Sequence, residues 1–229
     1  INTVASVIPI MPVDAGDLKH VPKERADHFQ LPFVAVSRPL NRDEVRKTPG
    51  AQAAVQKEWD KHHNQRTWLL DSVREYEDVR DEARSIHKEA HFGRVFQICH
   101  EKHSELQPEA RKYKGRVVFG GDQVTDHTSH FALFHDISSC GSLMVAGKIC
   151  DAIACLPGHI GEQSDAPSAY TQSELYEGHE QVDTWVFLPE DQWPTEWHGK
   201  YRRPVCRLRL ALYGHPLAGA FWEKHCQRI

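Results

Sequence analysis

Two predicted strands and the polar turn that joins them lie in residues 95–121, which read VFQICHEKHSELQPEARKYKGRVVFGG. The segments 95–99 and 113–119 are rich in β-branched and aromatic side chains, as strands are. Residues 102–109 between them are polar and include a proline, which is typical of a turn. The pattern therefore predicts a β-hairpin that ends at a pair of glycines.

Helical patterns flank the hairpin. Upstream, residues 51–63 carry apolar side chains at helical spacing and are predicted to form an amphipathic helix. The short apolar segment 67–70 is a strand candidate, and the charge-rich residues 71–91 are predicted to form a solvated helix. Downstream, residues 138–156 are predicted to form a buried helix, because one face would carry Leu143, Ala146, Cys150, Ile153 and Ala154.

Four more elements complete the predicted order. Short strands are expected at residues 159–164, 184–188 and 205–210, followed by a helix at 218–225. Because strands and helices alternate irregularly and include a hairpin, the sequence predicts an α+β fold rather than a doubly wound parallel sheet.

Residues 1–50 differ from the rest of the chain. They contain six prolines and no sustained periodicity, and proline at this density interrupts helices and sheet interiors. We therefore expect an extended Pro-rich arm or linker over residues 1–50, a boundary near Pro49 and Gly50, and one folded domain over residues 51–229.

The overall composition excludes several classes of protein. The chain has 229 residues, of which 40% are hydrophobic, and it carries 28 Lys and Arg against 32 Asp and Glu, a formal net charge of −4. These values exclude a disordered chain, a coiled coil and a collagen, and the acidic balance is unusual for a dedicated nucleic-acid binder. No apolar run reaches the roughly 18–20 residues that a membrane-spanning helix needs.

The N-terminus and the cysteines indicate the setting of the chain. It begins with Ile1 and shows no secretory signal, so we expect it to be part of a longer polypeptide. Its six cysteines are dispersed, unlike the dense framework of small secreted domains. Reduced thiols in an intracellular location, cytoplasmic or nuclear, are therefore expected.

Positive side chains concentrate in two places despite the acidic total. The hairpin carries Arg111, Lys112, Lys114 and Arg116, and the second cluster consists of Lys200, Arg202, Arg203, Arg207 and Arg209. Clusters of this kind bind phosphate groups. A solvated strand face explains them equally well, so both interpretations stay open.

An acidic residue and an aromatic residue lie close together further along the chain. Asp165 follows the predicted strand 159–164, and Tyr170 comes five positions later. A carboxylate at the end of a strand can bind Mg²⁺, which prefers oxygen ligands and retains several waters. An aspartate in such a place more commonly caps a turn or a helix.

Two pairs of residues have the spacing of metal ligands on a helix. His87 and His91 are four residues apart, as are Cys99 and His103. On one helical face, either pair would offer two zinc ligands. Because no CxxC pair accompanies them, ordinary surface or core residues are the favoured interpretation.

Several of these segments, in this order, resemble the reverse transcriptase of Ty1/copia-type retrotransposons. The matching segments are NQRTW at 64–68, YKGRVVFGGDQ at 113–123, Asp165 with Ala169 and Tyr170, VFLP at 186–189, and VCRLRLALYG at 205–214 followed by Trp222. The likeness covers residues 51–226, and the segment 205–214 is its most specific part.

The resemblance implies a fold, an activity and a site. The fold would be the fingers and a partial palm of a reverse-transcriptase-like polymerase, and the activity RNA-directed DNA synthesis by in-line phosphoryl transfer. Asp165 would be catalytic and bind Mg²⁺, Tyr170 would exclude the ribose 2′-hydroxyl of the nucleotide, and Lys114 and Arg116 would hold its triphosphate. The RNA or DNA template-primer would contact Arg202, Arg203, Arg207, Arg209 and Gly214.

The chain departs from the family at identifiable places. The family's second metal-binding motif contains an Asp-Asp pair, and this sequence has none. Residues 215–220 and 120–122 also differ from the family's usual residues. We therefore expect a reverse-transcriptase fragment that is inactive alone; the alternative is a non-catalytic structural or interaction subunit, bound to a protein partner or a larger assembly, that derives from such an element.

Overall fold

A mixed sheet is the main feature of the described part of the chain. The computed structural model describes residues 36–134, 144–162, 165–175 and 182–228. The strands are β1 (Ser37–Leu40), β2 (Trp68–Glu75), β3 (Ala90–Lys102), β4 (Lys112–Phe119), β5 (Thr125–Asp126), β6 (Asp183–Phe187) and β7 (Pro204–Leu208). The helices are α1 (Arg42–Lys47), α2 (Pro49–Asn64), α3 (Tyr76–Ser85), α4 (Met144–Ala154) and α5 (Ala218–Cys226). The predicted α+β class is therefore confirmed.

Strand β3 organises the sheet because other strands pair with both of its edges. The strand order is β1-β3-β6-β7-β2, while β4 and β5 pair with β3 off this path. Only the β3–β6 pair is parallel among the described strands. The predicted hairpin is confirmed as β3 and β4, which pair from Val95↔Phe119 to Lys102↔Lys112.

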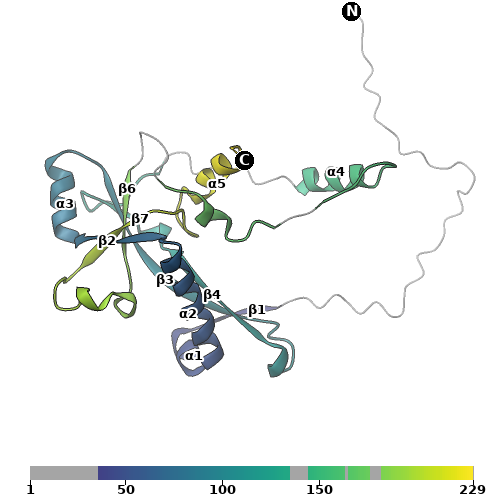
Figure 1. Ribbon diagram of the computed structural model, residues 1–229, viewed down its shortest axis with the longest axis horizontal. Coiled ribbons are helices and arrows are strands. Elements are labelled where there is room, and N and C mark those ends of the chain that lie inside the picture. Colours follow the sequence, from purple (N-terminus) through teal and green to yellow (C-terminus); the bar gives the residue numbers. More distant parts are fainter. Residues whose placement is uncertain (1–35, 135–143, 163–164, 176–181, 229) are drawn as a thin grey trace, which may run out of the picture. The chain divides into compact units, whose positions relative to one another are not determined.

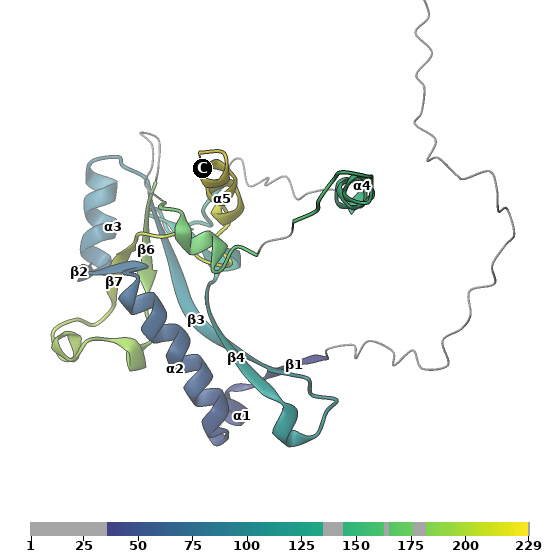
Figure 2. The same cartoon turned by 45° about the vertical axis from the view of Figure 1, so that its right-hand side comes forward.

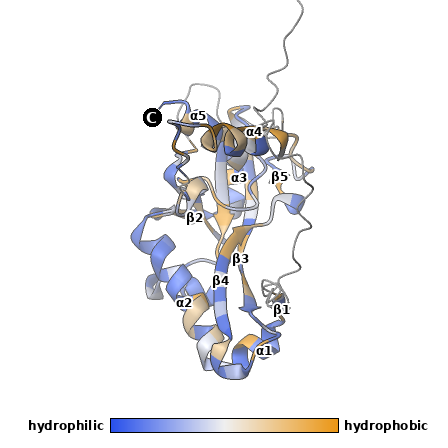
Figure 3. Cartoon of the chain, turned by 90° about the vertical axis from the view of Figure 1, so that its right-hand side faces the viewer, coloured by the Kyte–Doolittle hydropathy of each residue, from blue (hydrophilic) through white to orange (hydrophobic). Residues whose placement is uncertain are grey.

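Helix α2 lies along the β3–β4 hairpin, as Figure 2 shows. Pro49 begins it, and Ala51, Val55 and Trp59 recur on the face that is buried in the main core. The helix approaches β4 so closely that a Cβ on Gly115 would stand 2.6 Å from the carbonyl oxygen of Ala54. In Figure 3, the middle of β3 is hydrophobic and most of α2 is hydrophilic.

Helix α3 covers a second, smaller core. The sequence predicted one solvated helix over residues 71–91, but β2 continues to Glu75 and the helix ends at Ser85. Tyr76, Val79 and Ala83 of α3 are buried against apolar residues of β3, β6 and β7. Figure 1 shows the helix beside these strands.

Helix α4 differs from its predicted environment. The sequence predicted that residues 138–156 form a buried helix, and a helix does form at Met144–Ala154. Its side chains are exposed, however: Val145, Ile149 and Ile153 keep 63%, 53% and 47% of their surface. The prediction of burial was therefore wrong for the described residues, and Leu143 lies outside them.

Two boundaries also differ from the expectation. Residues 37–50 form β1, α1 and the start of α2 instead of an extended arm. A capping box begins α1: the side chains of Asn41 and Glu44 each accept a 2.9 Å hydrogen bond from the backbone N–H of the other residue. The expected arm over residues 1–35 lies outside the described residues. Residues 159–162 form no strand, and residues 163–164 of that predicted strand are likewise not described.

None of the described helices combines the length and the apolar character that crossing a membrane requires.

Candidate functional site

The cations of the hairpin gather on the face of the sheet that does not carry α2. Cross-strand partners share a face, and the register pairs Lys114 with His100 and Arg116 with Ile98. The alternate residues Gly115 and Val117 point to α2. We call the basic face the surface formed by Ser37, His100, Lys102, Lys114 and Arg116, which line a hollow of about 190 Å³.

Repulsion between like charges is the main electrostatic feature of the basic face. Arg116 lowers the pKa of Lys114 most strongly, with smaller contributions from burial and from Lys102. A cluster that disfavours its own charge is stabilised by an anion, since the anion offsets the repulsion. The basic face is therefore suited to a phosphate group.

Aromatic side chains connect the basic face to the segment after Asp165. The guanidinium carbon of Arg116 lies 5.4 Å from the ring centroid of Tyr213. The ring of Tyr213 lies in turn 4.7 Å from that of Tyr170, in an edge-to-face arrangement. Arg116 and Tyr170, both singled out in the sequence, are thus joined through a residue that the sequence analysis did not assign to the site.

A tight turn holds Tyr213 in this position. The N–H of Phe119, at the end of β4, donates a 2.7 Å hydrogen bond to the carbonyl oxygen of Tyr213. The next residue, Gly214, has φ of 88°, and a Cβ there would collide with the carbonyl oxygen of Phe119. Gly214 therefore has a packing role that brings the turn against β4.

Asp165 lies in an exposed segment that leads to Ser168 and Tyr170. The Nζ of Lys61 in α2 donates a 2.5 Å hydrogen bond to the Oγ of Ser168, which connects the two segments. The implied Mg²⁺ would need several oxygen ligands close together. Among the described residues, no three or more His, Cys, Asp or Glu side chains group together as a metal site would require. The described residues thus supply one candidate carboxylate, Asp165, and not the ligand set of a two-metal centre.

Three arginines of the second basic cluster have carboxylate partners. Arg203 pairs with Glu77 at 2.8 Å and lies over the Tyr76 ring; Arg207 pairs with Asp183 at 2.5 Å. Arg209 pairs with Glu174 at 2.6 Å.

Backbone contacts complete the surroundings of this cluster. Arg209 also donates to the carbonyl oxygens of Gln65 and Arg66, and the backbone N–H of Arg202 donates to Glu75. These contacts join β7 and the segments beside it to neighbouring elements. Nucleic-acid contact by Arg202, Arg203, Arg207 and Arg209 stays a prediction, and so does contact by Gly214.

The two suggested zinc pairs do not lie on helical faces. His87 follows the end of α3, whereas His91 and Cys99 belong to β3. His87 and His103 lie outside β3 and have φ of 52° and 57°, so the four-residue spacing does not place either pair on one helical face. Burial also raises the pKa of the Cys99 thiol, which disfavours the thiolate that binds zinc.

Sequence analysis missed part of the basic face. Lys102 was assigned to the turn, and Ser37 to the arm, whereas both lie in paired strands. The hairpin register could have revealed His100 and Lys102, since extending the Val95↔Phe119 pairing outward places them opposite Lys114 and Lys112. Tyr213 gave no such signal because its neighbour Arg116 is far away in sequence.

Comparison with known proteins finds no matching family model, no matching curated protein and no matching solved structure.

Proposed function

We propose that the chain is the fingers and a partial palm of a copia-type reverse transcriptase and that its basic face binds the phosphates of a nucleotide or of a template-primer. The contact of Arg116 with Tyr213, and of Tyr213 with Tyr170, carries the proposal. Three segments that the resemblance assigns to one polymerase, 113–123, 165–170 and 205–214, meet at this contact.

Each residue has a defined part in the proposed function. Lys114 and Arg116 supply positive charge to the phosphates, and in phosphoryl transfer such charge stabilises the transition state. The ring of Tyr170, held edge-to-face by Tyr213, limits the space beside the nucleotide's ribose. The family's Mg²⁺ would supply Lewis-acid stabilisation when bound, with Asp165 as its carboxylate.

Removing the two cations should weaken nucleic-acid binding and its dependence on salt. For Lys114→Ala/Arg116→Ala, we expect the affinity for a labelled primer-template to fall on the order of 10- to 100-fold at low salt. The slope of log affinity against log salt should decrease by about 2, because two phosphate contacts and their released counterions are lost. Fluorescence anisotropy over a salt series measures both quantities.

A control with the same loss of charge separates the basic face from the total charge. Lys57 of α2 and Lys224 of α5 are exposed cations outside the basic face. The Lys57→Ala/Lys224→Ala variant should bind like the unmodified chain. Equal weakening of both double variants, or no binding by the unmodified chain, contradicts the proposed function and favours the non-catalytic interaction subunit.

Polymerase activity is a separate question from binding. Because the sequence contains no Asp-Asp pair, we expect no primer extension by this chain when Mg²⁺ and nucleotides are supplied. Extension of a labelled primer on a gel is the measurement, with Asp165→Asn as the matched variant. Extension that disappears in Asp165→Asn would show that the chain is active after all.

A further inference from the structure

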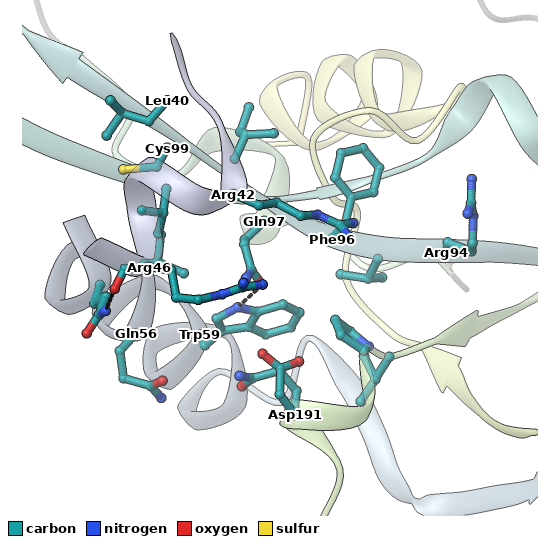
Figure 4. A pocket seen from close by; sticks show the side chains of 18 of the residues that line it. Leu40, Arg42, Arg46, Gln56, Trp59, Arg94, Phe96, Gln97, Cys99 and Asp191 are labelled. Carbon is teal, nitrogen blue, oxygen red and sulfur yellow. Dashed lines mark hydrogen bonds between the residues drawn. The ribbon is translucent and has the colours of Figure 1, made fainter. Parts of the chain in front are cut away.

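A sizeable cavity lies on the α2 side of the sheet. It has a volume of about 820 Å³ and is bordered by α1, α2, β3 and the residues that follow β6. Figure 4 shows Trp59 and Gln97 inside it, joined by a 2.9 Å hydrogen bond from the indole N–H to the amide oxygen. Cavities of this size accommodate several side chains of a bound partner.

One wall of the cavity is an unpaired stretch of strand edge. On one edge of β3, β6 pairs with residues up to Arg94 and β1 pairs with residues from Cys99 onward. Within the described part of the chain, no strand pairs with this edge at the four intervening residues, Val95, Phe96, Gln97 and Ile98. An open edge of this kind is a template for another strand.

The hydrogen-bond pattern shows which groups face the open edge. The N–H of Phe119 donates to Tyr213 and thus points away from β3, so Val95↔Phe119 is a non-hydrogen-bonded pair. Val95, and Gln97 two residues on, therefore turn their N–H and C=O groups away from β4. The register of the parallel pair Arg94↔Phe187 already engages the N–H of Val95 with β6. The C=O of Val95 and the N–H and C=O of Gln97 lie on the cavity side, where an added strand would bind them.

Charge and polarity of the lining define the kind of occupant. Apolar side chains of Leu40, Val55 and Leu188 line the cavity together with Trp59. Arg42 and Arg46 also line it, against one acidic residue, Asp191. The guanidinium group of Arg94 instead donates a hydrogen bond to Gln123, outside the cavity. The excess of positive charge is complementary to an acidic side chain next to apolar ones.

We propose that this cavity binds a short extended peptide of a partner protein, with acidic and apolar side chains in alternation, as an added strand on the open edge of β3. Backbone hydrogen bonds to Val95 and Gln97 would provide affinity, and the arginines would select acidic side chains. At roughly 3.3 Å per residue, the gap between β1 and β6 accommodates about four residues in the plane of the sheet. This site is distinct from the basic face and does not depend on its function.

Binding of a defined peptide to the full chain tests the proposal. The probe is the fluorescein-labelled hexapeptide Val-Glu-Val-Glu-Val-Thr, followed by anisotropy, and we expect a dissociation constant on the order of 10–100 µM. Hydrogen exchange should locate the site, because the amide of Gln97 should exchange about 10-fold more slowly with peptide bound.

Changes in the peptide examine the mechanism without changing the protein. Two N-methylated peptides cover the two sets of alternate amides, and only one set can face the open edge of β3. We expect methylation of that set to weaken binding about 10-fold or more, because it removes the backbone donors of the added strand. Replacing both glutamates by glutamine should weaken it about 10-fold, since the attraction to the arginines is lost.

Changes in the protein supply the matched control. Arg42→Glu/Arg46→Glu should weaken peptide binding about 10-fold or more. Lys47→Glu/Lys57→Glu makes the same change of charge at nearby residues outside the cavity and should bind as the unmodified chain does. Lys114→Ala/Arg116→Ala should also leave peptide binding unchanged. The proposal is overturned if the peptide shows no saturable binding up to about 1 mM. It is also overturned if both N-methylated peptides bind as tightly as the parent peptide, or if the two double Glu variants weaken binding equally.

Discussion

The Gly214→Ala variant should lose about 3 kcal/mol or more of the free energy of unfolding. Gly214 has φ of 88°, where an L side chain is strained by roughly 1–2 kcal/mol. An added Cβ would in addition collide with the backbone carbonyl of Phe119 at the end of β4, and a backbone oxygen cannot move aside as a flexible side chain can. Urea unfolding measured by tryptophan fluorescence gives the change.

The same sequence change at Gly199 separates conformational strain from collision. Gly199 has a similar φ of 76°, but a Cβ there would meet nothing within 4 Å. Gly199→Ala should therefore lose only about 1–2 kcal/mol. Equal losses for the two variants would mean that the close approach of the Tyr213–Gly214 turn to β4 is not required. If the approach is required, Gly214→Ala should also weaken nucleic-acid binding, because Tyr213 would move from Arg116.

The sequence correctly predicted elements whose pattern lies entirely within their own segment. The hairpin, helix α2 and strand β6 were found because each has a complete signal within its own segment. Residues 37–50 were missed although Asn41 and Glu44 form a recognisable capping box. The density of prolines suggested an arm, yet Pro39 is in a short edge strand and Pro49 begins a helix, both places that proline tolerates.

The environment of an element is less accessible to sequence reasoning than its type. Helix α4 has the row of apolar residues that a buried helix has, and the sequence alone does not show that Val145 and Ile149 are exposed. The candidate site divides in the same way. Lys114 and Arg116 were predicted from a local cluster, whereas their relation to Tyr170 depends on Tyr213, which lies 97 positions after Arg116 (213 − 116) and comes close only in the folded chain.

Acidification should unfold the protein because two histidines are buried in their neutral form. Burial lowers the pKa of His215 to about 3 and that of His62 to about 4. In the unfolded chain both would titrate near 6.5. Around pH 5 the unfolded state therefore binds up to two more protons than the folded state, and the free energy of unfolding decreases by up to about 3 kcal/mol for each unit by which the pH is lowered. Above about pH 7.5 the histidines are neutral in both states, and this contribution is constant.

The variant His215→Asn isolates one of these protons. The Nδ1 of His215 accepts a hydrogen bond from the Leu217 N–H at 3.2 Å, and the amide oxygen of asparagine can accept it instead.

The variant should be less stable at pH 8, since the contacts of the imidazole with the rings of Phe119 and Phe134 are lost. Its stability should nevertheless depend less steeply on pH, by about 1.4 kcal/mol per pH unit between pH 4 and 6.5. A pH dependence that is the same in His215→Asn and the unmodified chain would show that His215 takes up its proton in the folded state as well, and that the pocket formed by Phe119 and Phe134 admits charge.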